Sequence, residues 1–186
     1  VPNAQINILN LDYVHIDYER SKRIRIIDAP RMQSQDKIYQ QKLDVIKMLR
    51  YSLLHTDAGL IMVAEDDFPP CESLKGAISE IFTNNIFGRS FSSIITAVGM
   101  NGMIFQRVLV PKLIKYLKSG LDRNKQVDHM THEWLLKETE QAKSDLAGFY
   151  PVTTQVMHFR HTGVVSNFGH RHNPTSFQCG DSMKNA

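Results

Sequence analysis

The chain has 186 residues, of which 42% are hydrophobic and 22% are charged, a balance typical of one globular domain with a hydrophobic core. The formal net charge is +3 and the longest basic run is the short segment 20–25, so the charge pattern argues against nucleic acid as a partner. No stretch reaches the roughly 18 apolar residues that a membrane span needs, and no signal peptide opens the chain. Because the chain begins at Val1, without an initiator Met, we expect it to be a fragment of a longer protein. Cys71 and Cys179 allow one disulfide or none.

The first half of the chain predicts a strand, a helix and a second strand. A short strand is expected over residues 24–27, where isoleucines lie among basic residues before Pro30. Residues 36–55 carry an apolar residue every three or four positions, which is typical of an amphipathic helix with one buried face. The residues of this helix that we expect to face outward are Lys42, Asp44, Lys47 and Arg50. Residues 60–64 are uncharged and follow Gly59, so we expect a fully buried strand in the middle of a parallel or mixed sheet.

The second half predicts a further alternation of helices and strands around one turn. The turn is the segment Gly-Met-Asn-Gly at residues 99–102. The expected elements are a helix after Pro69-Pro70 that extends to Phe82, a strand over 93–98, a strand over 103–105, a helix from Pro111 to Gly120, a helix over 128–141 and a strand over 152–159. This alternation indicates an α/β fold. Residues 167–186 are rich in Gly, Asn, Ser and His, so we expect a loose C-terminal segment there.

Three consecutive carboxylates, Glu65, Asp66 and Asp67, directly follow the strand predicted over residues 60–64. In open α/β sheets, ligands bind at the carboxyl ends of the strands. Neighbouring negative charges repel one another and are costly to desolvate, so a divalent cation, a metal-bound phosphate or bulk water has to neutralise them. The acidic triplet therefore predicts a cation site, with a solvated acidic loop as the alternative.

Histidines cluster towards the C-terminus. They are His158, His161, His170 and His172, with Cys179 beyond them. Their spacing matches no structural zinc pattern, so we interpret His170 and His172 as solvated loop residues. His161 ends a predicted strand, and we expect it to approach the same metal ion as Asp67.

Two acids, Asp128 and Glu133, lie in the helix predicted over residues 128–141. An acid near a helix start is often only a cap or a favourable partner of the helix dipole. The alternative is a general base, which accepts a proton from an incoming hydroxyl group near a bound metal and sugar. The neighbouring His129 and His132 do not have the spacing of the zinc-protease motif, so this segment does not predict a zinc protease.

Short motifs occur in one order along residues 37–167. They are Tyr39-Gln-Gln-Lys-Leu-Asp44, Leu60-Ile-Met-Val-Ala-Glu-Asp-Asp-Phe68, Val98-Gly-Met-Asn-Gly-Met-Ile-Phe-Gln106, Lys125-Gln-Val-Asp128 and His158-Phe-Arg-His-Thr-Gly-Val-Val-Ser166. In order and spacing they resemble motifs of the eukaryotic N-acetylglucosaminyltransferase IV family and its relatives, among them the Golgi transferase that adds N-acetylgalactosamine to the mannose core of GPI anchors. Each motif is weak by itself, and the shared order carries the resemblance.

This resemblance implies a GT-A glycosyltransferase fold, a mixed sheet flanked by helices, in a partial domain over residues 1–166. Only 35 residues precede Asp36, so part of the N-terminal β-α-β portion that binds the nucleotide would be missing, and we expect this chain to bind UDP-sugars weakly or not at all. The implied function is inverting, metal-dependent transfer of an N-acetylhexosamine, GlcNAc or GalNAc, from a UDP-sugar donor to a mannose-containing glycan acceptor of an N-glycan or a GPI core. The implied parent protein is anchored in the Golgi or endoplasmic reticulum membrane, with this domain in the lumen.

The resemblance also implies roles for single residues. Asp67 corresponds to the metal ligand and His161 to a second metal or phosphate contact, for a Mn²⁺ ion that bridges the diphosphate of the donor. The implied cofactor-binding residues are Glu65, Asp66, Asn101 and Gly102. The glycines of the turn would let the backbone approach a sugar closely, and a plain tight turn is the alternative. Asp128 is the implied base by its position, and Glu133 is the rival because the Trp-Leu-Leu that follows the family's acid comes after Glu133 here.

Two other function classes stay open. A non-catalytic relative would keep the fold as an interaction module and would not need a base, although both candidate acids are present. A metal-dependent phosphohydrolase could use Asp66, Asp67, His158 and His161, and it would release sugar or phosphate to water without an acceptor.

Overall fold

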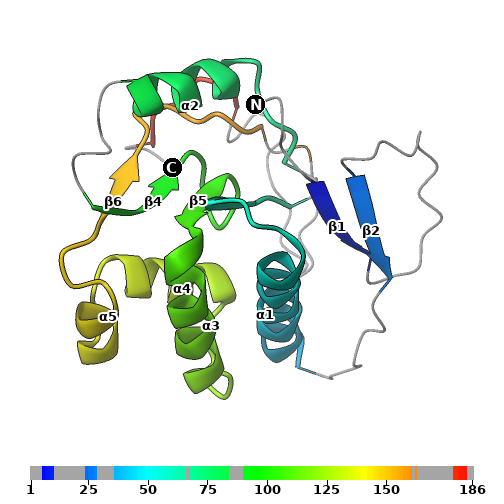
Figure 1. Ribbon diagram of the computed structural model, residues 1–186, viewed down its shortest axis with the longest axis vertical. Coiled ribbons are helices and arrows are strands. Elements are labelled where there is room, and N and C mark those ends of the chain that lie inside the picture. The colour runs from blue at the N-terminus through cyan, green and yellow to red at the C-terminus, as the bar shows by residue number, and fades with distance from the viewer. Residues whose placement is uncertain are drawn as a thin grey trace.

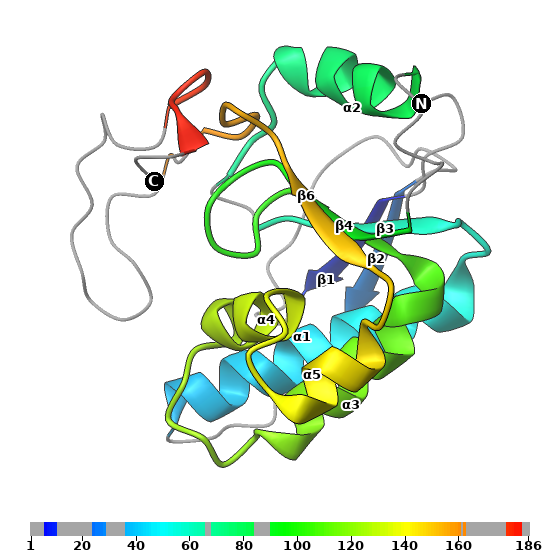
Figure 2. The ribbon, with the colours of Figure 1, turned by 90° about the vertical axis from the view of Figure 1, so that its left-hand side faces the viewer.

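Helices cover both faces of a four-stranded mixed sheet, so the predicted α/β class is confirmed (Figure 1). The computed structural model describes residues 6–10, 24–28, 36–65, 68–83, 90–160, 162 and 178–183. The elements are β1 (Ile6–Asn10), β2 (Ile24–Asp28), α1 (Lys37–His55), β3 (Leu60–Val63), α2 (Ser73–Thr83), β4 (Phe91–Ile95), β5 (Met103–Gln106), the 3₁₀-helix η2 (Arg107–Leu109), α3 (Val110–Ser119), α4 (Val127–Leu135), α5 (Glu140–Asp145) and β6 (Tyr150–Thr153). Figure 2 shows α2 on one side of the sheet and α1, α3, α4 and α5 on the other.

The four-stranded sheet has the strand order β3-β5-β4-β6, in which β4 and β6 are parallel and the other neighbours are antiparallel. Val63 of β3 lies opposite Met103 of β5, so the end of β3 is next to the turn 99–102 that precedes β5. Among the described strands, β3 lies at an edge, and its residue Met62 is 48% exposed. The prediction of a fully buried strand in the middle of a sheet was therefore wrong. In this antiparallel edge strand only alternate residues, Ile61 and Val63, are buried.

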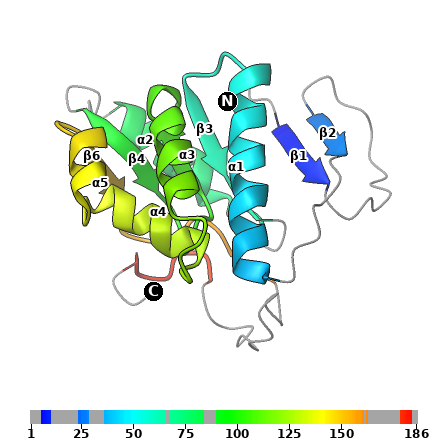
Figure 3. The ribbon, with the colours of Figure 1, turned by 90° about the horizontal axis from the view of Figure 1, so that it is seen from below.

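Strands β1 and β2 form a separate parallel pair, in which Ile6 lies opposite Ile24 and Asn10 lies opposite Asp28. β2 confirms the strand predicted over residues 24–27, whereas β1 was not predicted. Figures 1 and 3 show the pair beside α1, on the side away from α3.

The two largest apolar clusters of the described residues hold the helices on the two faces of the sheet. In the larger cluster, Leu49 of α1, Leu113 of α3 and Trp134 of α4 are completely buried together with Phe105 of β5. The second cluster lies at α2 and consists of the buried residues Phe68, Leu74, Ala97, Met157 and Phe159. Burial of one large apolar side chain contributes roughly 1.5–3 kcal/mol, so these contacts fix the helix layers against the sheet.

Helix α1 begins where the sequence predicted, because the Asp36 side chain caps it. Asp36 Oδ1 accepts hydrogen bonds from the backbone N–H groups of Ile38 (2.9 Å) and Tyr39 (3.1 Å). The prediction that Lys42 faces outward was wrong, because its side chain is fully buried. Lys42 Nζ donates to backbone carbonyl groups that follow α3, where the end of a helix leaves acceptors without helical partners.

Helices α4 and α5 replace the single helix predicted over residues 128–141. α4 ends at Leu135, and Lys137 then adopts a left-handed φ of 59°, so the chain leaves the helical path. The Thr139 side chain starts α5 by accepting a hydrogen bond from the N–H of Ala142 at 3.2 Å. None of the helices in the described part of the chain is both long enough and apolar enough to cross a membrane.

A disulfide between Cys71 and Cys179 attaches residues 178–183 to the segment before α2. The same residues pair with the backbone after β6: Met157 N–H donates to Asp181 O at 2.8 Å. The described part of the segment that was predicted to be loose is thus held in place. Residues 167–177 and 184–186 of that segment lie outside the described residues.

Candidate functional site

The turn at residues 99–102 connects β4 to β5 and forms the centre of the candidate site. Its two glycines have left-handed backbone conformations, with φ of 63° at Gly99 and 65° at Gly102. A Cβ atom on Gly102 would lie 2.1 Å from Thr96 Oγ1 and 2.4 Å from the Phe159 ring. The space beside Gly102 is thus filled by the protein's own side chains. This packing does not support the cofactor contact implied for Gly102.

The turn also holds the first carboxylate of the acidic triplet. Glu65 N–H donates to Asn101 Oδ1 at 2.8 Å, and Asn101 Nδ2 donates to Glu65 Oε2 at 3.4 Å. Gly102 N–H donates to Val63 O at 2.8 Å, which fixes the end of β3 against the turn. Asn101 is only 3% exposed, so its amide orients Glu65 and offers little surface to a ligand. The two residues are neighbours, as the predicted site requires.

Helix α4 brings Asp128 to the same turn. Asp128 Oδ1 accepts a hydrogen bond from the N–H of His129 at 2.7 Å. Asp128 Oδ2 lies 3.8 Å from the position that a Cβ atom would take on Gly99, and Asn101 Nδ2 lies 3.7 Å from that same position. The Asp128 carboxylate and the Glu65–Asn101 pair therefore meet around Gly99.

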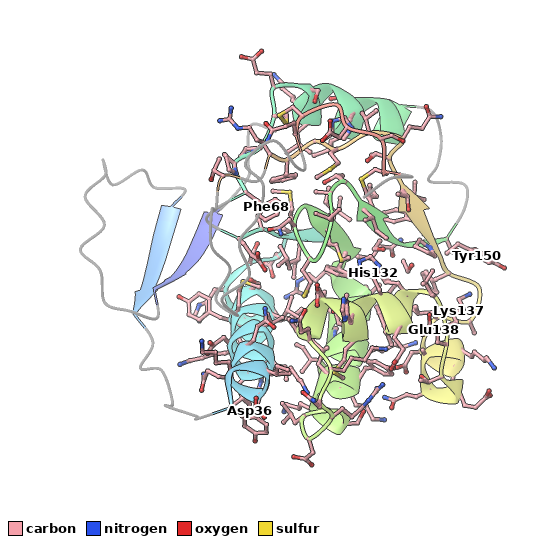
Figure 4. All side chains as sticks on the ribbon, turned by 180° about the vertical axis from the view of Figure 1, so that it is seen from behind. Asp36, Phe68, His132, Lys137, Glu138 and Tyr150 are labelled. Atoms are coloured by element: carbon pink, nitrogen blue, oxygen red, sulfur yellow. A yellow bond between two sulfur atoms is a disulfide. The ribbon has the colours of Figure 1, made fainter. Side chains whose placement is uncertain are left out.

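His132 is a further residue of this site, and no role was predicted for it from the sequence. Its Nε2 lies 3.2 Å from the carbonyl oxygen of Gly99, and Figure 4 shows the side chain between α4 and the sheet. Thr131 of the same helix contacts the turn as well, with its Oγ1 3.6 Å from Met100 Sδ. His132 follows Asp128 by one helical turn, and this spacing on one helix face was the signal that could have identified it.

Glu133, the rival candidate for the base, is only 6% exposed and binds four donor groups. Arg123 donates to both carboxylate oxygens, at 2.6 and 2.7 Å, and Lys125 Nζ and the Tyr116 hydroxyl donate as well. The hydrogen bonds from Arg123 hold the pKa of Glu133 well below its usual range, although burial acts in the opposite direction. A general base needs access to its substrate and a pKa nearer the working pH. The geometry therefore favours Asp128 over Glu133 as the base.

His158 supports the start of α2. It is only 6% exposed, and its Nδ1 lies 2.9 Å from Ser73 Oγ. Burial lowers the pKa of His158, which favours the neutral imidazole. Its backbone N–H donates to Thr96 O at 2.9 Å, and its carbonyl accepts from Cys71 N–H at 2.8 Å. These contacts argue against His158 as part of a phosphohydrolase site. His161, the predicted metal contact, lies outside the described residues.

The segment that follows the acidic triplet is fixed too. Phe68 is buried in the apolar cluster at α2, and its N–H donates to Glu65 O at 3.3 Å. Pro69 O accepts a hydrogen bond from Arg160 N–H at 3.1 Å. Both flanks of the triplet are therefore anchored, Glu65 by the turn and Phe68 by the core. Asp66 and Asp67 themselves lie outside the described residues.

The prediction of a metal site rests on the chemistry of the acidic triplet. Carboxylate oxygens are the ligands that hard divalent cations such as Mn²⁺ and Mg²⁺ prefer. Within the described residues, no group of three or more His, Cys, Asp or Glu side chains is placed to hold a metal ion. Comparison with protein-family models, with curated proteins and with solved structures gave no match for this chain. Its function is therefore inferred from the residues around the turn 99–102 and from the motif resemblance.

Proposed function

We propose that this chain is the catalytic part of an inverting, metal-dependent glycosyltransferase of the GT-A class, which moves an N-acetylhexosamine from a UDP-sugar to a mannose-containing glycan, an N-glycan or a GPI core. The observation that supports this most is that Glu65 is hydrogen-bonded to the turn 99–102, while Asp128 Oδ2 lies 3.8 Å from the position that a Cβ atom would take on Gly99 of the same turn. Such a reaction needs carboxylates near the donor phosphates and a separate base at the acceptor. The shared order of the sequence motifs supports the same function.

In the proposed reaction Asp128 is the base. Its Oδ1 accepts the N–H of His129, which orients the carboxylate, and its Oδ2 faces Gly99 of the turn. Oδ2 takes the proton of the acceptor hydroxyl while that oxygen forms its bond to the anomeric carbon. The bond from this carbon to the diphosphate oxygen breaks on the opposite face, so the configuration is inverted. A positioned base of this kind contributes roughly 10²–10⁴-fold to the rate.

The proposed role of the acidic triplet is to hold a divalent cation. Glu65, Asp66 and Asp67 offer carboxylate oxygens, and a bound Mn²⁺ ion would stabilise the negative charge that develops on the leaving diphosphate. Asn101 supports this role indirectly, because its buried amide donates a hydrogen bond of 3.4 Å to the Glu65 carboxylate.

We further propose that the parent protein is anchored in the Golgi or endoplasmic reticulum membrane with this domain in the lumen. The disulfide between Cys71 and Cys179 supports this location. Disulfides persist in oxidising compartments such as the lumen of the secretory pathway and are rare in the cytosol.

A transfer assay on the full-length protein tests the proposed function, with UDP-GlcNAc and UDP-GalNAc as donors, mannose-containing glycans as acceptors and Mn²⁺ present. We expect Asp128→Asn to lower kcat by roughly 10²–10⁴-fold, and Asp67→Ala to abolish transfer. Glu140→Gln is the matched control, because the Glu140 side chain on α5 is 88% exposed.

Other results of these assays would contradict the metal site or the transfer reaction. Activity that survives Asp67→Ala would refute the metal site, and hydrolysis of the donor without transfer would indicate a phosphohydrolase. No transfer with either donor would refute the proposal. Calorimetric titration of this chain alone with UDP-sugar and Mn²⁺ tests the expected weak binding, which micromolar affinity would contradict.

A further inference from the structure

A loop at residues 120–126 joins α3 to α4 and leads directly to Asp128. We propose that Lys42 and Glu133 are positioning residues that hold this loop, and through it hold Asp128 against the turn 99–102. The expected effect on the rate of transfer rests on the proposed function, whereas the expected effect on the loop does not.

Lys42 reaches the loop from α1 and binds its backbone. Lys42 Nζ donates to Gly120 O and Leu121 O, at 2.9 Å each, and also to Arg123 O. An ammonium group has three donors, so these carbonyl groups converge on one point and the loop backbone curves around it. Because Lys42 is fully buried, water does not easily replace it.

Glu133 holds the same loop from α4. Its carboxylate accepts hydrogen bonds from Arg123 and Lys125, which both belong to the loop, and from Tyr116 of α3. The loop is therefore held from two directions, by a buried cation of one helix and by a buried anion of another. Removal of the Lys42 ammonium group takes a donor from the carbonyl of the buried Gly120, and removal of the Glu133 carboxylate leaves the buried Tyr116 hydroxyl without its acceptor, which is costly. Arg123 and Lys125 are 43% and 31% exposed, so water can solvate their charges.

The cluster around Glu133 adds a polar restraint on the rotation of α4, beside the buried apolar residues of this helix such as Met130 and Trp134. The helix has no side-chain cap at its start, since Gln126 makes no such hydrogen bond. Successive residues of an α-helix are turned by about 100°, so Asp128 and His132 share one face and Glu133 lies about 140° around the helix from Asp128. With Glu133 fixed in its cluster, Asp128 is directed at Gly99.

Hydrogen exchange of the full chain tests the loop without any need for activity. Lys42→Met keeps the length of the side chain and removes its donors. Lys112→Met is the matched control, because Lys112 Nζ donates to one exposed carbonyl group, Asp145 O at 2.7 Å. In Lys42→Met we expect the amides of residues 120–131 to exchange at least about tenfold faster, with no such change in β4, in β5 or in the control. Unchanged exchange in residues 120–131 would overturn the proposal.

Transfer kinetics tests whether the loop acts through Asp128. At a temperature where each variant is folded, we expect Lys42→Met and Glu133→Gln to lower kcat roughly 10- to 100-fold with little change in the KM of the donor. A purely structural role would lower the melting temperature and leave kcat per folded molecule unchanged. Tyr116→Phe, which removes one donor from the cluster, is the milder variant if Glu133→Gln does not fold.

A double-mutant cycle completes this test. In an Asp128→Asn background, Lys42→Met should lower kcat only slightly further, because the carboxylate that Lys42 positions is already gone. Full additivity of the two changes would overturn the proposal. Absence of transfer by the unchanged protein would refute the proposed function instead, while the exchange result would still decide whether Lys42 holds the loop.

Discussion

Gly102 and Asn101 are neighbours in the turn 99–102, and both act inside the protein. Gly102 leaves room for Thr96 and Phe159, while Asn101 uses its amide to orient Glu65. Glu65 offers a carboxylate to a cation, whereas the Asn101 amide oxygen already accepts the Glu65 N–H and is buried. The turn therefore contributes to the site chiefly by holding a carboxylate in place.

Gly102→Ala should destabilise the protein by roughly 2–4 kcal/mol, because the new methyl group collides with Thr96 and Phe159 at a left-handed φ. Gly76→Ala is the control, since Gly76 lies in α2 with nothing within 4 Å of its Cβ position, and we expect it to be neutral or stabilising by up to about 1 kcal/mol. Urea unfolding measures both changes. Equal stability of the two variants would contradict the packing described for the turn.

The sequence identified candidate acids more readily than the partners that surround each of them. Glu65 and Asp128 were predicted at one site, and the structure brings both to the turn. Glu133 was the rival candidate for the base, because nothing in its own segment shows that Arg123, Lys125 and Tyr116 bind it. The role of a carboxylate depends on such partners, and tertiary structure brings them together.

At the scale of elements, the spacing of apolar residues predicted which face of a helix is directed towards the core. It did not predict the polar contacts inside the core. The prediction of a helix over residues 36–55 was right, because its apolar residues recur at helical spacing and Asp36 caps it. Lys42 was placed on the wrong side, since its partners lie 78 to 81 residues further along the chain. The break at Lys137 was missed because residues 137–141 contain no Gly or Pro that would mark a helix end.

The hydrogen bond between His158 and Ser73 joins α2 to the segment after β6 and should depend on pH. Burial lowers the pKa of His158, so between this lowered value and the ordinary value near 6.5 the unfolded chain binds more protons than the folded protein. The free energy of unfolding should therefore fall as the pH drops below about 6.5. His158→Asn, which does not titrate there, should lose this component.

Guanidinium unfolding at several pH values between about 5 and 8 measures this difference. The matched control is His129→Asn, because His129 is an exposed histidine of α4. If His158→Asn and the unchanged protein lose stability in parallel as the pH falls, His158 does not carry the effect.

At the scale of the whole molecule, the site lies where three layers meet (Figure 2). The sheet supplies the end of β3 and the turn, the lower helix layer supplies α4, and the segment before α2 flanks the acidic triplet. The disulfide ties this last segment to residues 178–183, which come more than a hundred residues later. The sequence could not show this, because two cysteines allow either a bond or two free thiols.

Replacement of both cysteines, Cys71→Ser with Cys179→Ser, should lower the free energy of unfolding by roughly 3–5 kcal/mol, because the bond closes a loop over a sequence separation of 108. Reductant should destabilise the unchanged protein by a similar amount and leave the double variant unaffected. Thermal unfolding with and without reductant measures both effects. If reductant leaves the melting temperature of the unchanged protein the same, the bond does not form.

The hydrogen bonds from Lys42 to the loop 120–126 all go to backbone carbonyl groups, which every amino acid carries. The loop residues Asp122 and Asn124 are exposed, so their replacement leaves these acceptors in place. Insertion or deletion of one residue would shift the acceptors away from the ammonium group. Evolution should therefore conserve the length of this loop more strictly than its amino acids, and an alignment of relatives that allows gaps here would miss the constraint.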